Sequence, residues 1–179
     1  MYDHLTDPAA GHLPHDLITS IREVYEPAGM VVTDGARRET ESAEYGACRV
    51  GLDGRLVVFR VAKTTPTKLG QFVTMWKRTT PESEIAPFDV SDGVAFVVVS
   101  VSDTTRRGQF VFSQRVLADQ GVMSRGGAGG KRAIRVYPPW VTLAAKEAIR
   151  TQRWQVTCFL PLGPDGTADP VQVRKRFQA

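Results

Sequence analysis

Residues 44–63 begin with a glutamate and end with a lysine, and their spacing about a central turn predicts that the two side chains lie close together. Asp53-Gly54 is typical of a two-residue type I′ hairpin turn, which needs positive φ at both positions. If these residues form the loop, Leu52 faces Arg55. The same pairing, continued along the strands, places Glu44 opposite Lys63 at the open end of the hairpin. A carboxylate facing an ammonium group across two strands forms an ion pair, worth a few tenths of a kcal/mol.

The segment after the hairpin has the residue types of an anion-binding site. Thr65 is a candidate N-cap, Pro66 suits the first helical position, and apolar residues then recur with helical spacing at Leu69, Phe72, Val73 and Trp76. A helix starting here would point free amide groups and the hydroxyls of Thr65 and Thr67 at an anion. Lys63 and Lys68 would flank that anion. A lysine in the first turn interacts unfavourably with the helix dipole, so helix stability does not account for Lys68. An anionic partner would account for it, and a surface lysine without a binding role is the alternative.

The composition is that of an ordinary soluble protein. With 179 residues, 42% hydrophobic and 23% charged, the chain is expected to form one domain, 1–179, in which residues 1–13 are a loosely ordered lead. No apolar run approaches the ~20 residues of a membrane helix, and the polar N-terminus lacks a signal-peptide pattern, so we expect a cytoplasmic protein. Cys48 and Cys158 fit buried free thiols.

The net charge of +4 conceals an uneven distribution. Residues 1–45 hold nine acidic residues and three arginines, a net charge of −6, so the remainder of the chain carries +10. A basic body indicates a polyanionic partner such as nucleic acid, and charge for solubility is the equal alternative. Lys131, Arg132 and Arg135 follow the glycine-rich segment 124–130, which we expect to be a mobile loop, and are candidate phosphate contacts.

The remaining pattern predicts an α/β protein with a mixed central β-sheet flanked by helices. Residues 14–26 have an amphipathic helical stripe, and the second hairpin strand is apolar on both faces apart from Arg60, as in a central strand. Arg60 therefore forms a buried ion pair or reaches an anion, the ion pair being favoured. Further elements are expected as strands at 95–101, 109–113, 131–137 and 154–160, a helical turn at 116–120 and a helix at 142–151.

Several sequence blocks together resemble the MepB family of small bacterial proteins. They are ESAEYGAC (41–48), FRVAKTTPTKLGQFVTMWKR (59–78), GQFVF (108–112), GKRAIRVYPPW (130–140) and TQRWQ (151–155), and they span most of the chain. The resemblance implies a fold similar to the restriction-endonuclease-like PD-(D/E)XK core, and it implies DNA binding. Helix, strand, hairpin, helix and strand, in the order expected above, are compatible with that core.

The resemblance also implies roles for the charged residues of the hairpin. In nucleases of this fold, an acid on one strand and an acid-x-Lys on the next hold a divalent metal and activate water. Lys63 takes the lysine position, Glu44 takes the first acid, and Glu41 and Glu44 are the implied ligands of Mg²⁺ or Mn²⁺. Val61 stands where the second acid belongs, so Glu41, Glu23 or Glu26 would have to substitute for it. Metal-dependent endonuclease activity is thus an open expectation.

Three functions follow from these observations. The first is a nucleic-acid-binding protein, with DNA as the expected partner, that contacts phosphate through Lys63, Lys68, Arg132 and Arg135. The second is a binder of, or enzyme for, a small anion such as a nucleotide, with aromatic walls from Tyr137, Trp140 and Trp154. The third is a regulatory module that binds another protein, for which the acidic N-terminal segment is the main support.

Overall fold

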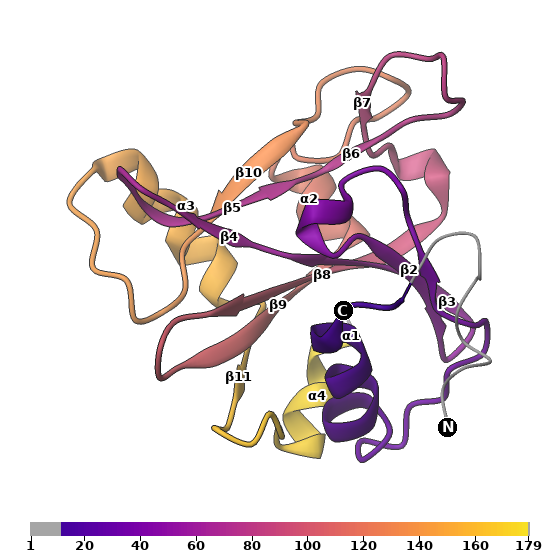
Figure 1. The fold of residues 1–179 in the computed structure, drawn as a ribbon. Helices are drawn as coiled ribbons and strands as arrows, with labels where there is room; N and C mark the ends of the chain where they lie inside the picture. The colour runs from indigo at the N-terminus through magenta and orange to yellow at the C-terminus, as the bar shows by residue number, and fades with distance from the viewer. Residues whose placement is uncertain (1–11, 179) are drawn as a thin grey trace.

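A six-stranded mixed β-sheet forms the centre of the computed structural model, which describes residues 12–178 (Figure 1). The strand order is β1-β2-β3-β8-β9-β11, in which β3 and β8 pair in parallel and the other neighbours are antiparallel. The predicted mixed sheet with flanking helices is confirmed. The strands are β1 Arg37–Arg38, β2 Cys48–Leu52, β3 Arg55–Val61, β8 Val94–Ser102, β9 Arg107–Ser113 and β11 Phe159–Leu162.

The hairpin of β2 and β3 has the register that its turn predicts. Asp53 and Gly54 have φ of +50° and +74°, and Leu52 pairs with Arg55 across them. The pairing stops at Cys48, where β2 begins. Before that point, Ser42 and Gly46 adopt left-handed conformations around a short 3₁₀ helix, η3, at Ala43–Tyr45. The predicted strand pairing of Glu44 with Lys63 is therefore wrong, because Glu44 lies on η3.

The helix predicted after the hairpin is also wrong, because these residues form strands. β4 Lys63–Thr65 and β5 Lys68–Thr74 make a second hairpin across the turn Pro66-Thr67, and β10 Ala133–Val136 completes the sheet β10-β5-β4. Gly70 has φ of +74°, which a helix interior does not accommodate. The chain continues into β6 Trp76–Lys77, paired with β7 Ala86–Pro87.

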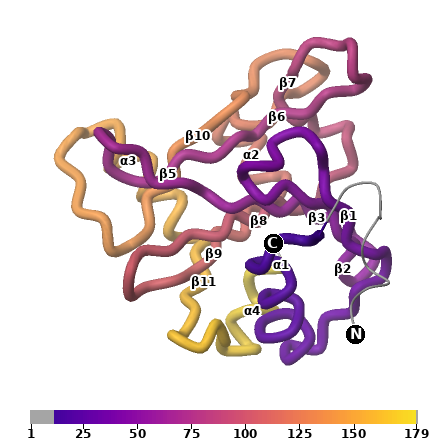
Figure 2. Tube along the Cα trace, viewed as in Figure 1, coloured from indigo at the N-terminus to yellow at the C-terminus, as the bar shows by residue number. Residues whose placement is uncertain are grey.

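The two faces of the six-stranded sheet carry separate parts of the core. Along β8, Phe96 and Val98 face one cluster of buried residues, whereas Val97 and Val99 face the other. Figures 1 and 2 show helices on one face and the smaller sheet on the other. The first face packs on α1 His15–Ser20, the π-helical turn η2 Ile21–Tyr25 and α4 Pro170–Arg176, and the second on the β10-β5-β4 sheet, α2 Gln114–Asp119 and α3 Lys146–Val156.

Helix α3 replaces the start of the strand predicted at 154–160. Trp154 and Val156 belong to α3, and the strand β11 begins only at Phe159. Gln155 is fully buried and completes the free edge of β10, because its Nε2 donates to Arg135 O and its Oε1 accepts from Tyr137 N. The other predicted strands and the helices at 14–26 and 116–120 are confirmed within one to three residues.

The remaining predictions concern the N-terminal lead and the membrane. The expectation of a loosely ordered lead lies outside the described residues for 1–11, and Leu13, which it included, is 6% exposed and belongs to the core. Within residues 12–178, no helix has the length and hydrophobicity needed to cross a membrane.

Candidate nucleic-acid interface

The outward face of the β10-β5-β4 sheet presents a row of one aromatic and two cationic side chains. Lys63 of β4 pairs with Phe72 of β5, and Phe72 pairs in turn with Arg135 of β10. Their strand neighbours Val73 and Ile134 point the other way, into the core. Lys63, Phe72 and Arg135 therefore lie side by side across three strands, on the face that turns away from the main sheet. Together with Tyr45 of η3, we call them the cation–aromatic row.

Ring contacts join the four members of the cation–aromatic row. Lys63 Nζ lies 4.9 Å from the centre of the Tyr45 ring, and the Tyr45 and Phe72 ring centres are 6.0 Å apart. The Arg135 guanidinium lies 6.0 Å from the centre of the Phe72 ring. Lys63 is exposed, whereas both rings and Arg135 are half-buried. Such a combination is typical of nucleic-acid binding, because the cations contact phosphate groups and the partly exposed rings stack on bases.

Hydrogen bonds hold Tyr45 and Arg135 in place. Arg135 donates to Thr65 Oγ1 at 2.6 Å and to Leu69 O at 3.3 Å, which ties β10 to both strands of the hairpin. The turn that carries Tyr45 is joined to β5 because Thr74 Oγ1 donates to Ser42 Oγ at 2.9 Å. Partial burial, and secondarily the Glu44 carboxylate, raise the pKa of the Tyr45 phenol above its usual value. The ring is therefore neutral at physiological pH.

Lys63 and Arg135 of the cation–aromatic row are among the predicted site residues, whereas its aromatic members Tyr45 and Phe72 are not. Lys63, Thr65 and Arg135 come together here, while Lys68 and Thr67 are exposed at the end of the hairpin. Without a helix, the predicted cluster of free amide groups at the helix N-terminus does not form. Phe72 was expected on the apolar stripe of that helix. Successive side chains of a strand point to opposite faces of the sheet. A strand prediction for this segment would therefore have placed Phe72 on the outward face and Val73 in the core.

A pocket of about 560 Å³ adjoins the cation–aromatic row, between β10 and α3. Its basic lining residues are Lys131, Arg135 and Arg150, and Glu147 is the acidic one. Tyr137 and Trp154 line it as well, but Trp140 lines a different groove, with the β4–β5 turn and Arg106. The three aromatic residues predicted to wall one small-anion site therefore do not surround one cavity. Arg132 is exposed just before β10.

Arg60 lies in the protein interior, where it forms the buried ion pair that was favoured for it. Its side chain is 2% exposed, Nη1 lies 2.8 Å from Glu39 Oε2, and its guanidinium is 5.7 Å from the Phe88 ring centre. Glu39 also pairs with Arg49 Nε at 2.5 Å. Burial lowers the pKa of Arg60, and the Glu39 carboxylate opposes that shift. A buried, paired guanidinium does not reach an external phosphate.

The carboxylates proposed as metal ligands do not fit a divalent cation. Glu41 pairs with Arg78 Nε at 3.0 Å, and Glu44 is exposed on η3. Glu23 and Glu26 belong to or follow η2, which packs on the opposite face of the main sheet from β4. Within residues 12–178, no three His, Cys, Asp or Glu side chains gather where they would hold one metal ion. Mg²⁺ prefers several oxygen ligands in octahedral geometry, which this donor set does not supply.

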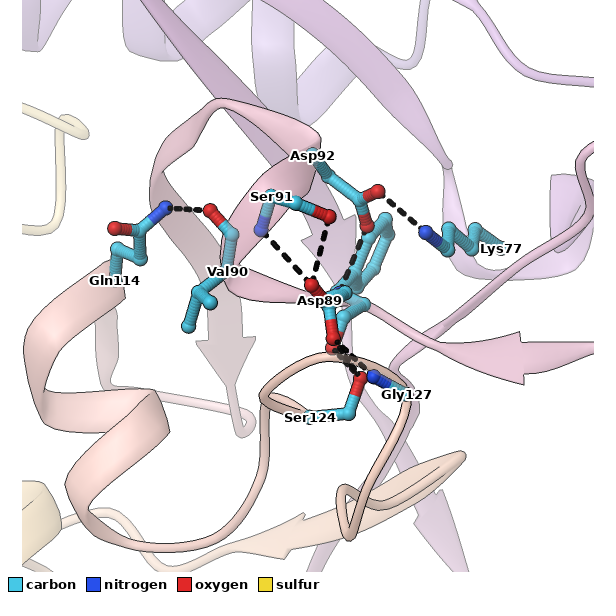
Figure 3. A network of polar contacts seen from close by, with 9 residues as sticks. Lys77, Asp89, Val90, Ser91, Asp92, Gln114, Ser124 and Gly127 are labelled. Carbon is cyan, nitrogen blue, oxygen red and sulfur yellow. Dashed lines mark hydrogen bonds and ion pairs between the residues drawn. The ribbon is translucent and has the colours of Figure 1, made fainter.

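The glycine-rich segment 124–130 is anchored by the carboxylate of Asp89, which is the N-cap of the 3₁₀ helix η4 Val90–Asp92 (Figure 3). Asp89 Oδ2 accepts from Ser124 Oγ at 2.7 Å and from Gly127 N at 3.0 Å. Its Oδ1 accepts from the amide and hydroxyl of Ser91 at 2.9 and 2.7 Å. These bonds restrain a loop that its glycine content predicted to be mobile.

We expect the Asp89 network to make stability depend on pH in the acid range. Hydrogen bonds from Gly127, Ser91 and Ser124 to the ionised form hold the pKa of Asp89 far below its usual value. The resulting stabilisation is fully present above the unfolded pKa of about 3.9, and it decreases as pH falls below that value toward the folded pKa. Asp89→Asn should therefore destabilise the protein at neutral pH, and the difference from wild type should shrink below about pH 4. Urea unfolding at several pH values measures this, and a difference that does not change with pH would contradict it.

These features define a class of protein: a small α/β protein with a mixed central sheet and a second sheet whose outer face bears the cation–aromatic row. The chain belongs to the MepB-like family, whose model matches residues 39–161. The crystal structure of MepB is similar to it, with a TM-score of 0.67 and 31% identity, covering 70% of this chain and 84% of that one. No protein with a curated description matches the sequence. The resemblance read from the sequence blocks is confirmed, and the matched range contains the whole cation–aromatic row.

Proposed function

We propose that this protein binds nucleic acid through the outward face of the β10-β5-β4 sheet, with DNA as the expected ligand. The observation that carries the proposal is the cross-strand row of Lys63, Phe72 and Arg135, with Tyr45 beside it. Its cations suit phosphate oxygens, and its rings suit base faces. DNA binding is also what resemblance to the MepB family implies.

The charge distribution supports a polyanionic ligand. The net charge of +10 on residues 46–179 attracts phosphate over the body of the chain. Glu44 is the sequence neighbour of Tyr45 on η3, and Glu41 is paired with Arg78. Because these carboxylates do not fit a metal, the proposal is binding, and phosphodiester hydrolysis is not part of it.

Fluorescence anisotropy with a labelled oligonucleotide, titrated at several salt concentrations, tests this function. Lys63→Ala should weaken binding several-fold and reduce the slope of log affinity against log salt by roughly one phosphate contact, about 0.7–0.9. Lys175→Ala is the matched control, since Lys175 is exposed on α4 across the main sheet from the cation–aromatic row. Equal effects of the two variants, or no binding even at low salt, would overturn the proposal.

The same assay carries a cleavage arm that keeps the endonuclease expectation testable. Oligonucleotide is incubated with the protein and Mg²⁺ or Mn²⁺, with Glu44→Gln and Lys63→Ala as variants. We expect intact oligonucleotide in every reaction, because the carboxylates do not form a metal site. Cleavage by wild type that both variants abolish would instead place a catalytic centre at Glu44 and Lys63.

A further inference from the structure

The two rings of the cation–aromatic row are suited to stacking on unpaired bases. Within a double helix, both faces of an internal base are covered by its neighbours, so an aromatic side chain on a protein surface cannot stack on it. In single strands the base faces are free, and proteins that bind such strands stack them on aromatic side chains or on arginine guanidinium planes. Phe72 on the outward face of the sheet and Tyr45 on the adjoining η3 are each partly exposed, with ring centres 6.0 Å apart.

The cations beside these rings are placed to contact a backbone on either side. Within residues 12–178, the Tyr45 ring is the one contact seen for the Lys63 ammonium, so this exposed side chain is free to turn toward a phosphate. Arg135 is fixed by its bonds to Thr65 and Leu69, and a guanidinium has five N–H donors, so donors remain for a phosphate. Across three strands spaced about 4.8 Å apart, the row is about 10 Å wide.

The pocket between β10 and α3 extends this surface on the Arg135 side. Arg135 belongs to both, since it lies beside Phe72 and also lines the pocket. Beyond it, Lys131 and Arg150 are exposed cations of the same lining. Tyr137 and Trp154 add aromatic walls, and among the described lining residues Glu147 is the one acid. This cationic pocket of about 560 Å³ begins where the row ends, so it can accept the next part of a flexible anionic chain that is bound along the row.

We propose that the ligand is a single-stranded nucleic acid, whose bases stack on Tyr45 and Phe72 and whose backbone runs past Arg135 into the pocket lined by Lys131 and Arg150. This inference rests on the proposed function and specifies its ligand. A duplex would meet the same cations without stacking on the rings, so it would bind more weakly and mainly through charge.

The test compares a single strand of about twelve nucleotides with its duplex by anisotropy at one salt concentration. Wild type should bind the single strand at least tenfold more tightly. Phe72→Leu should weaken single-strand binding about tenfold, because stacking of one base is lost, and should weaken duplex binding much less. Phe72→Tyr keeps an aromatic ring and should restore single-strand binding. Circular dichroism melts of each variant show that the fold is kept. If Phe72→Leu unfolds, Tyr45→Leu removes the other ring of the row and supplies the same comparison, with Tyr45→Phe as its control.

The pocket is tested by oligonucleotide length. Arg150→Ala should weaken binding of the strand of about twelve nucleotides several-fold, but not that of a strand of about four, which covers the row alone. Duplex binding that equals single-strand binding and is insensitive to Phe72→Leu would overturn this inference while leaving the proposed function intact. An effect of Arg150→Ala that does not depend on length would remove the pocket from the path. No binding of either form would overturn both proposals.

Discussion

Glu39→Ala is expected to lower the free energy of unfolding by about 3–5 kcal/mol, the largest effect that we expect from a single side-chain truncation in this protein. The reason is the partner that remains: Arg60 is 1% exposed and would keep its charge without a counter-ion. Among residues 12–178, Arg60 Nε has no hydrogen-bond partner, so few other contacts would compensate for the lost carboxylate. Arg49 would lose its short contact with Glu39 as well. Urea unfolding at neutral pH, followed by circular dichroism, measures the change.

Two variants separate the buried charge from the loss of an ion pair in general. Glu41→Ala removes an exposed partner of Arg78 and should cost at most about 1 kcal/mol. Glu39→Leu combined with Arg60→Met removes both charges, so it should recover most of the stability that Glu39→Ala loses. If the double variant were as unstable as Glu39→Ala, the cost would arise from packing and not from an unpaired arginine.

Gly70→Ala should destabilise the protein by about 2–4 kcal/mol, from the sum of overpacking and a left-handed backbone. Gly70 has φ of +74°, and a Cβ there would lie 2.5 Å from Tyr137 Cδ1 and 2.7 Å from the carbonyl oxygen of Val136. The backbone oxygen belongs to β10, so relief would require the hairpin to move away from that strand. Because the cation–aromatic row spans the same strands, we expect oligonucleotide binding to fall together with stability.

Gly54→Ala is the matched control for Gly70→Ala. Gly54 has the same φ of +74°, but a Cβ at this exposed turn would meet no atom of the described residues within 4 Å. Its replacement should therefore cost only the left-handed conformation, roughly 1–2 kcal/mol. Thermal melts of the two variants give the comparison, and equal losses would show that the contact with Tyr137 and Val136 has no energetic weight.

The hairpin of β2 and β3 was predictable because its determinants are local. Asp53-Gly54 selects a turn with two positive φ values, and the turn fixes which residues face each other. The same reasoning failed beyond Cys48, where Ser42 and Gly46 adopt left-handed conformations and end the pairing. Turn chemistry sets the register near the turn, but it does not say how far two strands continue.

The helix expected at 66–76 shows why spacing alone was insufficient. Leu69, Phe72, Val73 and Trp76 have helical spacing, and Pro66 suits both a first helical turn and the corner of a β-turn. Gly70 was the contrary signal, since glycine weakens a helix interior by about 1 kcal/mol. The preference for strands comes from β10, some sixty residues later, which pairs with β5 and supplies the Tyr137 contact at Gly70.

Some features of this protein follow from local sequence, and others arise only when distant segments pack together. Residue types and local turn chemistry were enough for the family resemblance, the mixed sheet, the first hairpin and the burial of Arg60. The candidate interface needed the fold, because its members come from η3, β4, β5 and β10 and meet only through pairing between distant strands. That pairing faces Phe72 outward between Lys63 and Arg135. Glu44 is not paired with Lys63 for a local reason, because the pairing of β2 with β3 ends at Cys48 and Glu44 lies on η3. Local preferences decide turns and periodicity, whereas the neighbours across a sheet are set by which distant segments bury their apolar faces together.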